Sequence, residues 1–91
     1  MPSPSLVKWH PPLNRFMGEI SEVPLAGPVP LGELLARFRD REPRLEPFFR
    51  FGADDTRPKG LMVMRGAQRL NLTDPVEPGD EVEILVAVQG G

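Results

Sequence analysis

Hydrophobic and polar residues alternate along the first part of the chain. In Ser5–His10, Val7 and Trp9 fall on one side, and this period of two predicts a strand. Two consecutive prolines, Pro11 and Pro12, stop it. Phe16–Val23 can then pair back as a second strand, which would complete an N-terminal hairpin with a long loop.

The pattern changes to helical spacing in Leu31–Arg41. Its apolar residues form one stripe, and its charged residues fall mostly on the other side. Pro30 stands where a first-turn proline is tolerated, and Pro43 ends the run. The apolar group in Leu45–Phe51 predicts a short helical turn at the edge of the core.

The C-terminal third returns to strand patterns. Gly52–Gly60 is expected to be a loop, and a hairpin follows, with strands Leu61–Arg65 and Gln68–Leu72. After the turn Glu77–Asp80, a final strand covers Glu81–Val88. Its row of β-branched residues would be exposed at a sheet edge, so we expect this strand to be central and parallel to Ser5–His10.

This order of elements predicts an α+β fold of the β-grasp type, in which a mixed sheet of four to five strands covers one main helix. We expect a single domain, residues 1–88, followed by a flexible C-terminal tail, residues 89–91. The residues expected to be largely buried are Val7, Trp9, Leu34, Leu35, Phe38, Val82, Ile84 and Val86.

Composition narrows the function classes. The chain has 91 residues and a formal net charge of −2, which argues against nucleic acid as the main partner. It has no cysteine, which fits a cytoplasmic protein and excludes a thiolate site. No run approaches the roughly 18 apolar residues of a membrane helix, so we expect no membrane partner.

The sequence contains no convincing catalytic or metal-binding constellation. His10 is the only histidine, and it borders a proline turn, so a surface imidazole is the expected role. Asp54 and Asp55 are adjacent and lack the alternating spacing of a calcium site. Glu81 and Glu83 fit an exposed strand face with alternating charge. We therefore expect neither an enzyme nor a metal protein.

The end of the chain is its most distinctive feature. Gly79-Asp80-Glu81-Val82 leads into an apolar run, and the chain stops on Gly90-Gly91. With the upstream stretch Met62–Gly66, this ending resembles the ubiquitin-like sulfur carriers of the MoaD/ThiS family. The motifs match over Leu61–Gly91, and the likeness before that is one of architecture.

The resemblance implies a function for the glycines. A partner, the E1-like activating enzyme, would use ATP to adenylate Gly91, and the adenylate would become a thiocarboxylate. Gln89 and Gly90 would thread into that enzyme, because glycine lacks Cβ and fits a narrow channel. The carrier itself would bind no cofactor and would be a monomer when free. A sulfur-accepting synthase subunit would be its second partner.

The alternation of the last strand suggests where partners dock. Leu85 and Ala87 point opposite to Ile84 and Val86, so they would lie on the open face of the sheet, beside Leu6. An apolar patch near a functional tail is a plausible docking surface.

Two alternatives stay open. Gly91 could be conjugated to lysines of other proteins, as in ubiquitin-like modifiers, or the chain could be a β-grasp subunit that only binds a partner. The receiving pathway is also open among molybdopterin, thiamine, cysteine, thiolated tRNA and secondary metabolites. Departures from the family pattern bear on it: Arg65 replaces a turn asparagine, and Val86-Ala87-Val88 lacks the proline pair that many members carry. The segment Glu42–Lys59 is also longer than in compact members, as in carriers that serve cysteine synthesis.

Overall fold

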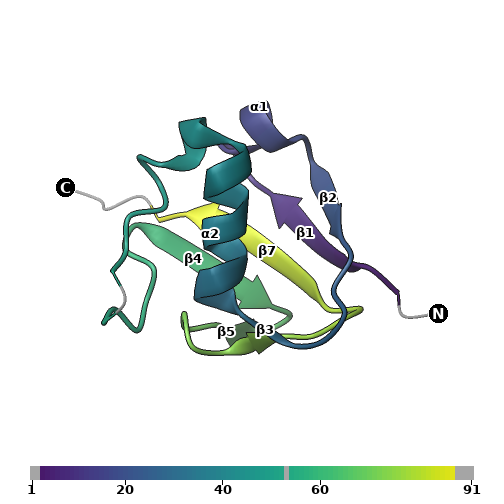
Figure 1. Ribbon diagram of the computed structural model, residues 1–91. Helices are drawn as coiled ribbons and strands as arrows, with labels where there is room; N and C mark the ends of the chain where they lie inside the picture. The colour runs from purple at the N-terminus through teal and green to yellow at the C-terminus, as the bar shows by residue number, and fades with distance from the viewer. Residues whose placement is uncertain (1–2, 53, 88–91) are drawn as a thin grey trace.

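A computed structural model describes residues 3–52 and 54–87, and in it one helix crosses one face of a twisted sheet (Figure 1). The helices are α1 (Asn14–Met17), α2 (Leu31–Arg41) and the 3-10 turn η1 (Pro43–Leu45). The strands are β1 (Ser5–Trp9), β2 (Ile20–Val23), β3 (Val29–Pro30), β4 (Leu61–Arg65), β5 (Gln68–Arg69), β6 (Pro75–Val76) and β7 (Glu81–Val86).

The strand order confirms the expected β-grasp architecture. The main sheet has the order β2-β1-β7-β4-β5, and β3 pairs with β6 in a separate two-stranded ladder. The first and last long strands, β1 and β7, are parallel neighbours in the middle of the sheet, while β7 and β4 are antiparallel. The predicted central position of the last strand is therefore correct.

The helix α2 has the bounds that its apolar spacing predicts. Its buried residues Leu31, Leu34, Leu35 and Phe38 lie against the sheet. The first two helical amides are bonded to a distant segment, since Leu31 N–H donates to Asp74 O at 2.9 Å and Gly32 N–H to Leu72 O at 2.9 Å. No side chain caps this end.

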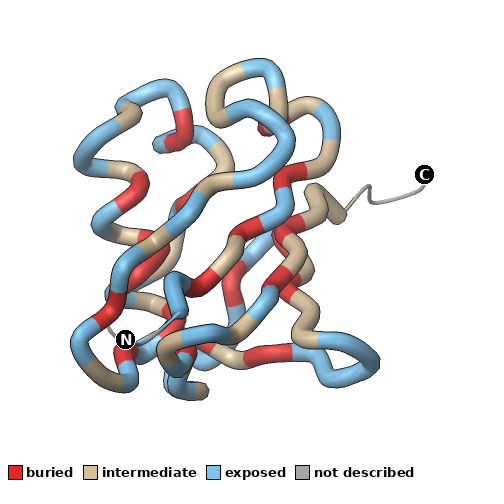
Figure 2. Tube along the Cα trace, turned by 90° about the vertical axis from the view of Figure 1, so that its right-hand side faces the viewer, coloured by how far each residue is buried: buried red, intermediate tan, exposed pale blue. Residues whose placement is uncertain are grey.

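An aromatic cluster fills the core next to α2. Trp9 meets Phe38 edge to face, with ring centroids 5.0 Å apart, and stacks on Phe49 at 6.3 Å. The indole Nε1–H donates to Ser21 Oγ at 2.9 Å, which satisfies the one polar group of the buried ring. Buried positions alternate with accessible ones along the strands (Figure 2).

Nearly all of the expected core residues are confirmed as buried. They are Val7, Trp9, Leu34, Leu35, Phe38, Val82 and Ile84. Val86 is the exception, because it is only partly buried at the last position of β7. The core also includes residues that were not predicted, among them Leu13, Leu70 and Val76, which are almost fully enclosed.

The predicted second strand, Phe16–Val23, is wrong in its first half. Arg15 N–H donates to Pro12 O and Phe16 N–H to Leu13 O, so local bonds form the helix α1 instead. Gly18 ends it with φ at 77°, a conformation that glycine adopts without strain. The strand β2 therefore starts only at Ile20.

Other boundaries also shift. The strand predicted as Gln68–Leu72 ends at Arg69, because Leu72 N–H turns away to donate to Thr56 O at 2.8 Å. The helical turn expected in Leu45–Phe51 is wrong in its bounds, because the 3-10 turn covers Pro43–Leu45 and ends where it was predicted to begin. Leu45 and Phe49 are nevertheless buried. The first strand ends at Trp9 rather than His10. The last strand ends at Val86, and Val88 lies outside the described residues.

Candidate functional site

The strand that carries the chain's end is held on both sides. In β7, Val82 pairs with Val7 of β1, and Ile84 pairs with both Trp9 of β1 and Val63 of β4. Beyond the strand, Ala87 N–H donates to Gly60 O at 2.9 Å. The last described residue of the chain is therefore fixed to the loop that precedes β4.

The residues predicted to do the chemistry follow directly. Gln89, Gly90 and Gly91 lie outside the described residues, as does Val88. An extended segment of three residues, the length of the predicted tail Gln89–Gly91, spans about 10 Å. The described part of the chain thus supplies the anchor for the predicted tail.

The open face of the sheet lies opposite α2 and carries a mixed apolar surface. Leu85 pairs with Met62 across β7 and β4, and Met64 of β4 lies one step along. Leu85, Ala87 and Leu6 are all half-buried. Ile20, in the edge strand, is 57% exposed.

The expected proximity of Leu6 to Leu85 is wrong. Leu6 pairs with Glu81, at the beginning of β7, whereas Leu85 lies near its end. The residue that comes next to Leu85 is His10, which follows β1 and whose backbone amide donates to Ile84 O at 3.3 Å. Alternation correctly placed Leu6 and Leu85 on one face, but the parallel register separates them.

Charged groups gather in the middle of this face. Glu83 has Lys8 Nζ 3.8 Å from Oε1 and His10 Nε2 3.8 Å from Oε2. His10 Nε2 is buried and has no hydrogen-bond partner within the described residues. His10 is the first residue after β1, and its side chain is 31% exposed beside Glu83, which agrees with the surface position expected for it.

Arg65 is a structural residue that sequence reasoning did not identify. Its Nη1 donates to Asp80 Oδ2 at 2.8 Å and to Pro75 O at 3.0 Å. Asp80 Oδ2 also accepts the Glu77 amide at 2.9 Å. These bonds tie the end of β4 to the turn that starts β7. Arg65, which stands where the resemblance led us to expect asparagine, thus has a clear local role.

The described residues contain no group of three or more His, Cys, Asp or Glu that could hold a metal ion. Asp55 Oδ2 instead accepts the Gly52 amide at 2.7 Å, and its other oxygen lies 4.0 Å from Lys59 Nζ. Within residues 3–52 and 54–87, no helix is both long and apolar enough to cross a membrane.

A sheet with the parallel strands β1 and β7 in its middle and one main helix across one face has the β-grasp fold of ubiquitin-like proteins. A solved structure, that of SAMP1 from Haloferax volcanii, is similar to this chain with a TM-score of 0.73 and 25% sequence identity. The likeness covers 96% of this chain and 98% of that one. No curated protein matches the chain.

Comparison of the sequence with family models assigns the chain to one family within this class. A model of the ThiS family matches residues 13–91, and the chain belongs to this family. It is therefore a ubiquitin-like sulfur carrier or modifier. Small carriers of this family are not themselves enzymes, and they work with E1-like activating enzymes and sulfur-accepting enzymes in general.

Proposed function

We propose that this protein is a sulfur carrier that holds sulfur as a thiocarboxylate on Gly91. The observation that supports the proposal is the terminal Gly90-Gly91 pair of a ThiS-family chain, which in the sequence is separated by three residues from the end of the central strand β7. The carrier would work in the cytoplasm as a monomer without a cofactor of its own. ATP would be bound by the activating enzyme.

The chemistry explains why a partner must activate the terminus. A carboxylate is ionised at neutral pH and is a poor electrophile. Its oxygen would attack the α-phosphate of ATP and release pyrophosphate, which leaves an acyl-adenylate on Gly91. Hydrosulfide would then add at the carbonyl carbon and expel AMP, which leaves with the carboxylate oxygen that had attacked the phosphate, while the other oxygen stays on Gly91. The resulting thiocarboxylate would donate its sulfur to the accepting synthase.

The tail would enter the activating enzyme, and the open face of the sheet would dock against it. Gln89 and Gly90 would thread into the activating enzyme, since a chain without Cβ at its tip fits a narrow channel. The open face would dock, with Leu85 and Ala87 next to the tail and Leu6 at the far end of the face. The charged group around Glu83 would orient the partner more than it would add affinity.

Deletion of Gly91 tests the proposal. Incubated with ATP, its activating enzyme and a sulfide source, the intact protein should exchange one oxygen for sulfur at its terminus, as measured by intact-protein mass spectrometry. The deletion variant, and a variant with one residue added after Gly91, should show no exchange but should melt at the same temperature. A deletion variant that supports sulfur transfer at the full rate would contradict the proposal.

Conjugation to lysines is the second candidate, because it requires the same activated glycine and the family assignment includes it. The two outcomes differ in mass spectra of the cellular protein. A carrier shows the exchange of oxygen for sulfur, whereas a modifier shows isopeptide-linked species on other proteins. Loss of function after deletion of Gly91 would also exclude a subunit that only binds.

A further inference from the structure

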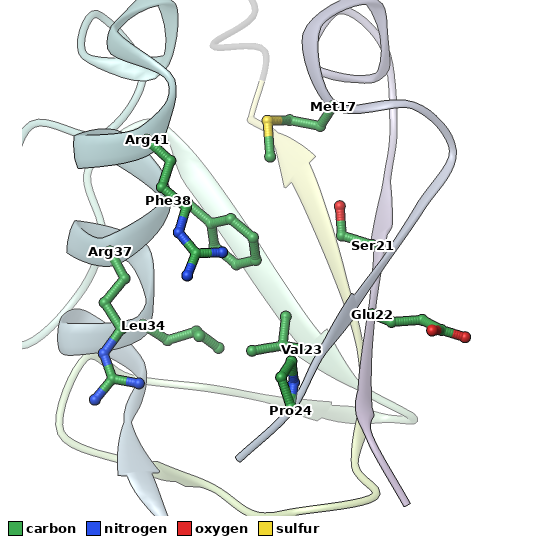
Figure 3. Close-up of a pocket in the computed structure, with 9 residues that line it drawn as sticks. All are labelled: Met17, Ser21, Glu22, Val23, Pro24, Leu34, Arg37, Phe38 and Arg41. Carbon is green, nitrogen blue, oxygen red and sulfur yellow. The ribbon is translucent and has the colours of Figure 1, made fainter.

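A groove lies between the edge strand β2 and the helix α2, on the side of the sheet opposite the open face. Its apolar lining comes from Met17, Val23, Leu34 and Phe38, whose side chains point into it (Figure 3). Arg37 and Arg41 lie along the same side of α2, one helical turn apart, while Glu22 points away from the groove.

The adjoining edge of β2 carries backbone groups that have no partner among residues 3–52 and 54–87. Trp9 N–H donates to Glu19 O at 2.8 Å, and bonded and non-bonded pairs alternate along an antiparallel ladder. Val7–Ser21 and Ser5–Val23 are therefore the bonded pairs between β1 and β2. The N–H and C=O groups of Ile20 and Glu22 consequently face outward from the sheet.

We propose that this edge and groove bind an extended acidic peptide segment of a partner protein, which adds to the sheet as a strand beside β2. Side chains of an added strand alternate between two faces. Every second residue would enter the groove and should therefore be apolar and of valine size. Carboxylates at the ends of the segment would pair with Arg37 and Arg41. This mode of recognition combines main-chain bonds for affinity with pockets for specificity.

The charge of the groove favours an acidic peptide over a second copy of this chain as the molecule that binds there. Arg37 has one ion pair, with Glu33 at 3.6 Å on the exposed helix surface, which is easily exchanged for another carboxylate. A second copy of this chain is a poorer fit. In a two-fold symmetric pairing through β2, the arginines of one copy would meet those of the other.

This surface is separate from the proposed carrier chemistry. It uses β2 and α2, whereas Leu85 lies on the opposite face in β7. The proposal therefore predicts that peptide binding persists when Gly90 and Gly91 are deleted, and it can fail independently of sulfur transfer.

A synthetic peptide tests the proposal. The probe is acetyl-Asp-Asp-Val-Thr-Val-Thr-Val-Asp-Asp-amide, and the control has lysines in place of the aspartates. In a titration followed by amide and methyl NMR, the aspartate peptide should shift the signals of Ile20, Glu22 and Leu34, and it should leave Met62 and Leu85 unchanged. The lysine peptide should not bind.

Matched variants separate charge from backbone recognition. R37E/R41E should lower the affinity about tenfold, whereas R57E/R69E has the same change in net charge away from the groove and should lower it less than about twofold. Glu22→Pro removes one outward N–H at an edge, where proline is tolerated, and should abolish binding. Glu22→Ala keeps that N–H and should bind like the wild type.

If Glu22→Pro does not fold, two further peptides test the backbone hydrogen bonds to β2. One is N-methylated at the three valines and the other at the two threonines, and only one of these sets has its N–H groups toward β2. One peptide should therefore lose binding and the other keep it. Absence of saturable binding, shifts centred on the open face, equal losses in both double variants, or a dimer formed through β2 would each overturn the proposal.

Discussion

Ile84 is the residue on which the central strand depends most. It is 1% exposed and pairs with Trp9 on one side and Val63 on the other. Truncation to alanine leaves a cavity between α2 and the sheet, so we expect Ile84→Ala to cost about 2–5 kcal/mol of unfolding free energy. Leu35→Ala should behave similarly, because Leu35 is also fully buried.

Denaturant unfolding measures both effects, with Val86→Ala as the control. Val86 is partly buried, so its truncation removes less buried area and should cost less than that of Ile84. Equal losses for Ile84→Ala and Val86→Ala would contradict this view of the core.

Arg65 gives a second prediction at the residue scale. Its side chain is 27% exposed, and its guanidinium donates to Asp80, Pro75 and Gln68. Arg65→Ala leaves the Asp80 carboxylate without its cation, so we expect a loss of about 1–3 kcal/mol, typical of hydrogen bonds to charged groups. Thermal unfolding of Arg69→Ala, an exposed arginine in neighbouring β5, provides the control and should change little.

Period-two and helical spacing correctly predicted seven of the eight positions expected to be buried, but they missed other core residues such as Leu13, Leu70 and Val76. Val7, Trp9 and Ile84 were placed correctly because each lies on the apolar side of an alternating strand. Arg65 could not be assigned in this way. Its partners Pro75 and Asp80 come from another part of the chain, and the residue alone indicates only a polar turn.

At the scale of elements, the long helix could be predicted from the sequence, whereas the shortest helices and strands could not. The helix α2 has four apolar residues on one stripe, and its bounds were predicted correctly. The helix α1 has four residues in all and no buried side chain, so it has no apolar stripe to detect. The ladder of β3 with β6 has two residues per strand, and it depends on tertiary contacts that no local pattern encodes.

The register of β1 on β7 also determines which docking residues matter. Leu85 lies near the end of β7 and is next to His10, whereas Leu6 pairs with Glu81 at its beginning. We expect Leu85→Glu to weaken binding to the activating enzyme more than Leu6→Glu, because it buries an unpaired charge closer to the tail.

Isothermal titration with the activating enzyme and its ATP analogue measures this difference. Both variants should keep the wild-type melting temperature within a few degrees, since both side chains lie on the open face. A larger loss from Leu6→Glu would place the docking surface at the other end of the sheet.

For the whole molecule, the sequence defined the end of the chain better than the surface around it. Gly90-Gly91 after an apolar strand is a short motif that can be read directly, and the central position of β7 followed from its β-branched row. The groove beside α2 could not be read in the same way. It combines residues from α1, β2 and α2, which come together only in the fold.

If docking and chemistry are divided between sheet and tail, changes to each should affect different steps. Gly90→Leu adds a bulky side chain to the segment that must thread, so it should slow adenylation strongly and leave docking affinity nearly unchanged. Leu85→Glu should weaken docking while adenylation at saturating activating enzyme stays close to the wild-type rate. Binding is measured by titration and adenylation by pyrophosphate release.

Because the two changes are separated along the chain and act on different steps, the double variant should show the sum of both effects. Equal losses of docking and adenylation in both single variants would mean that the sheet and the tail are recognised as one unit.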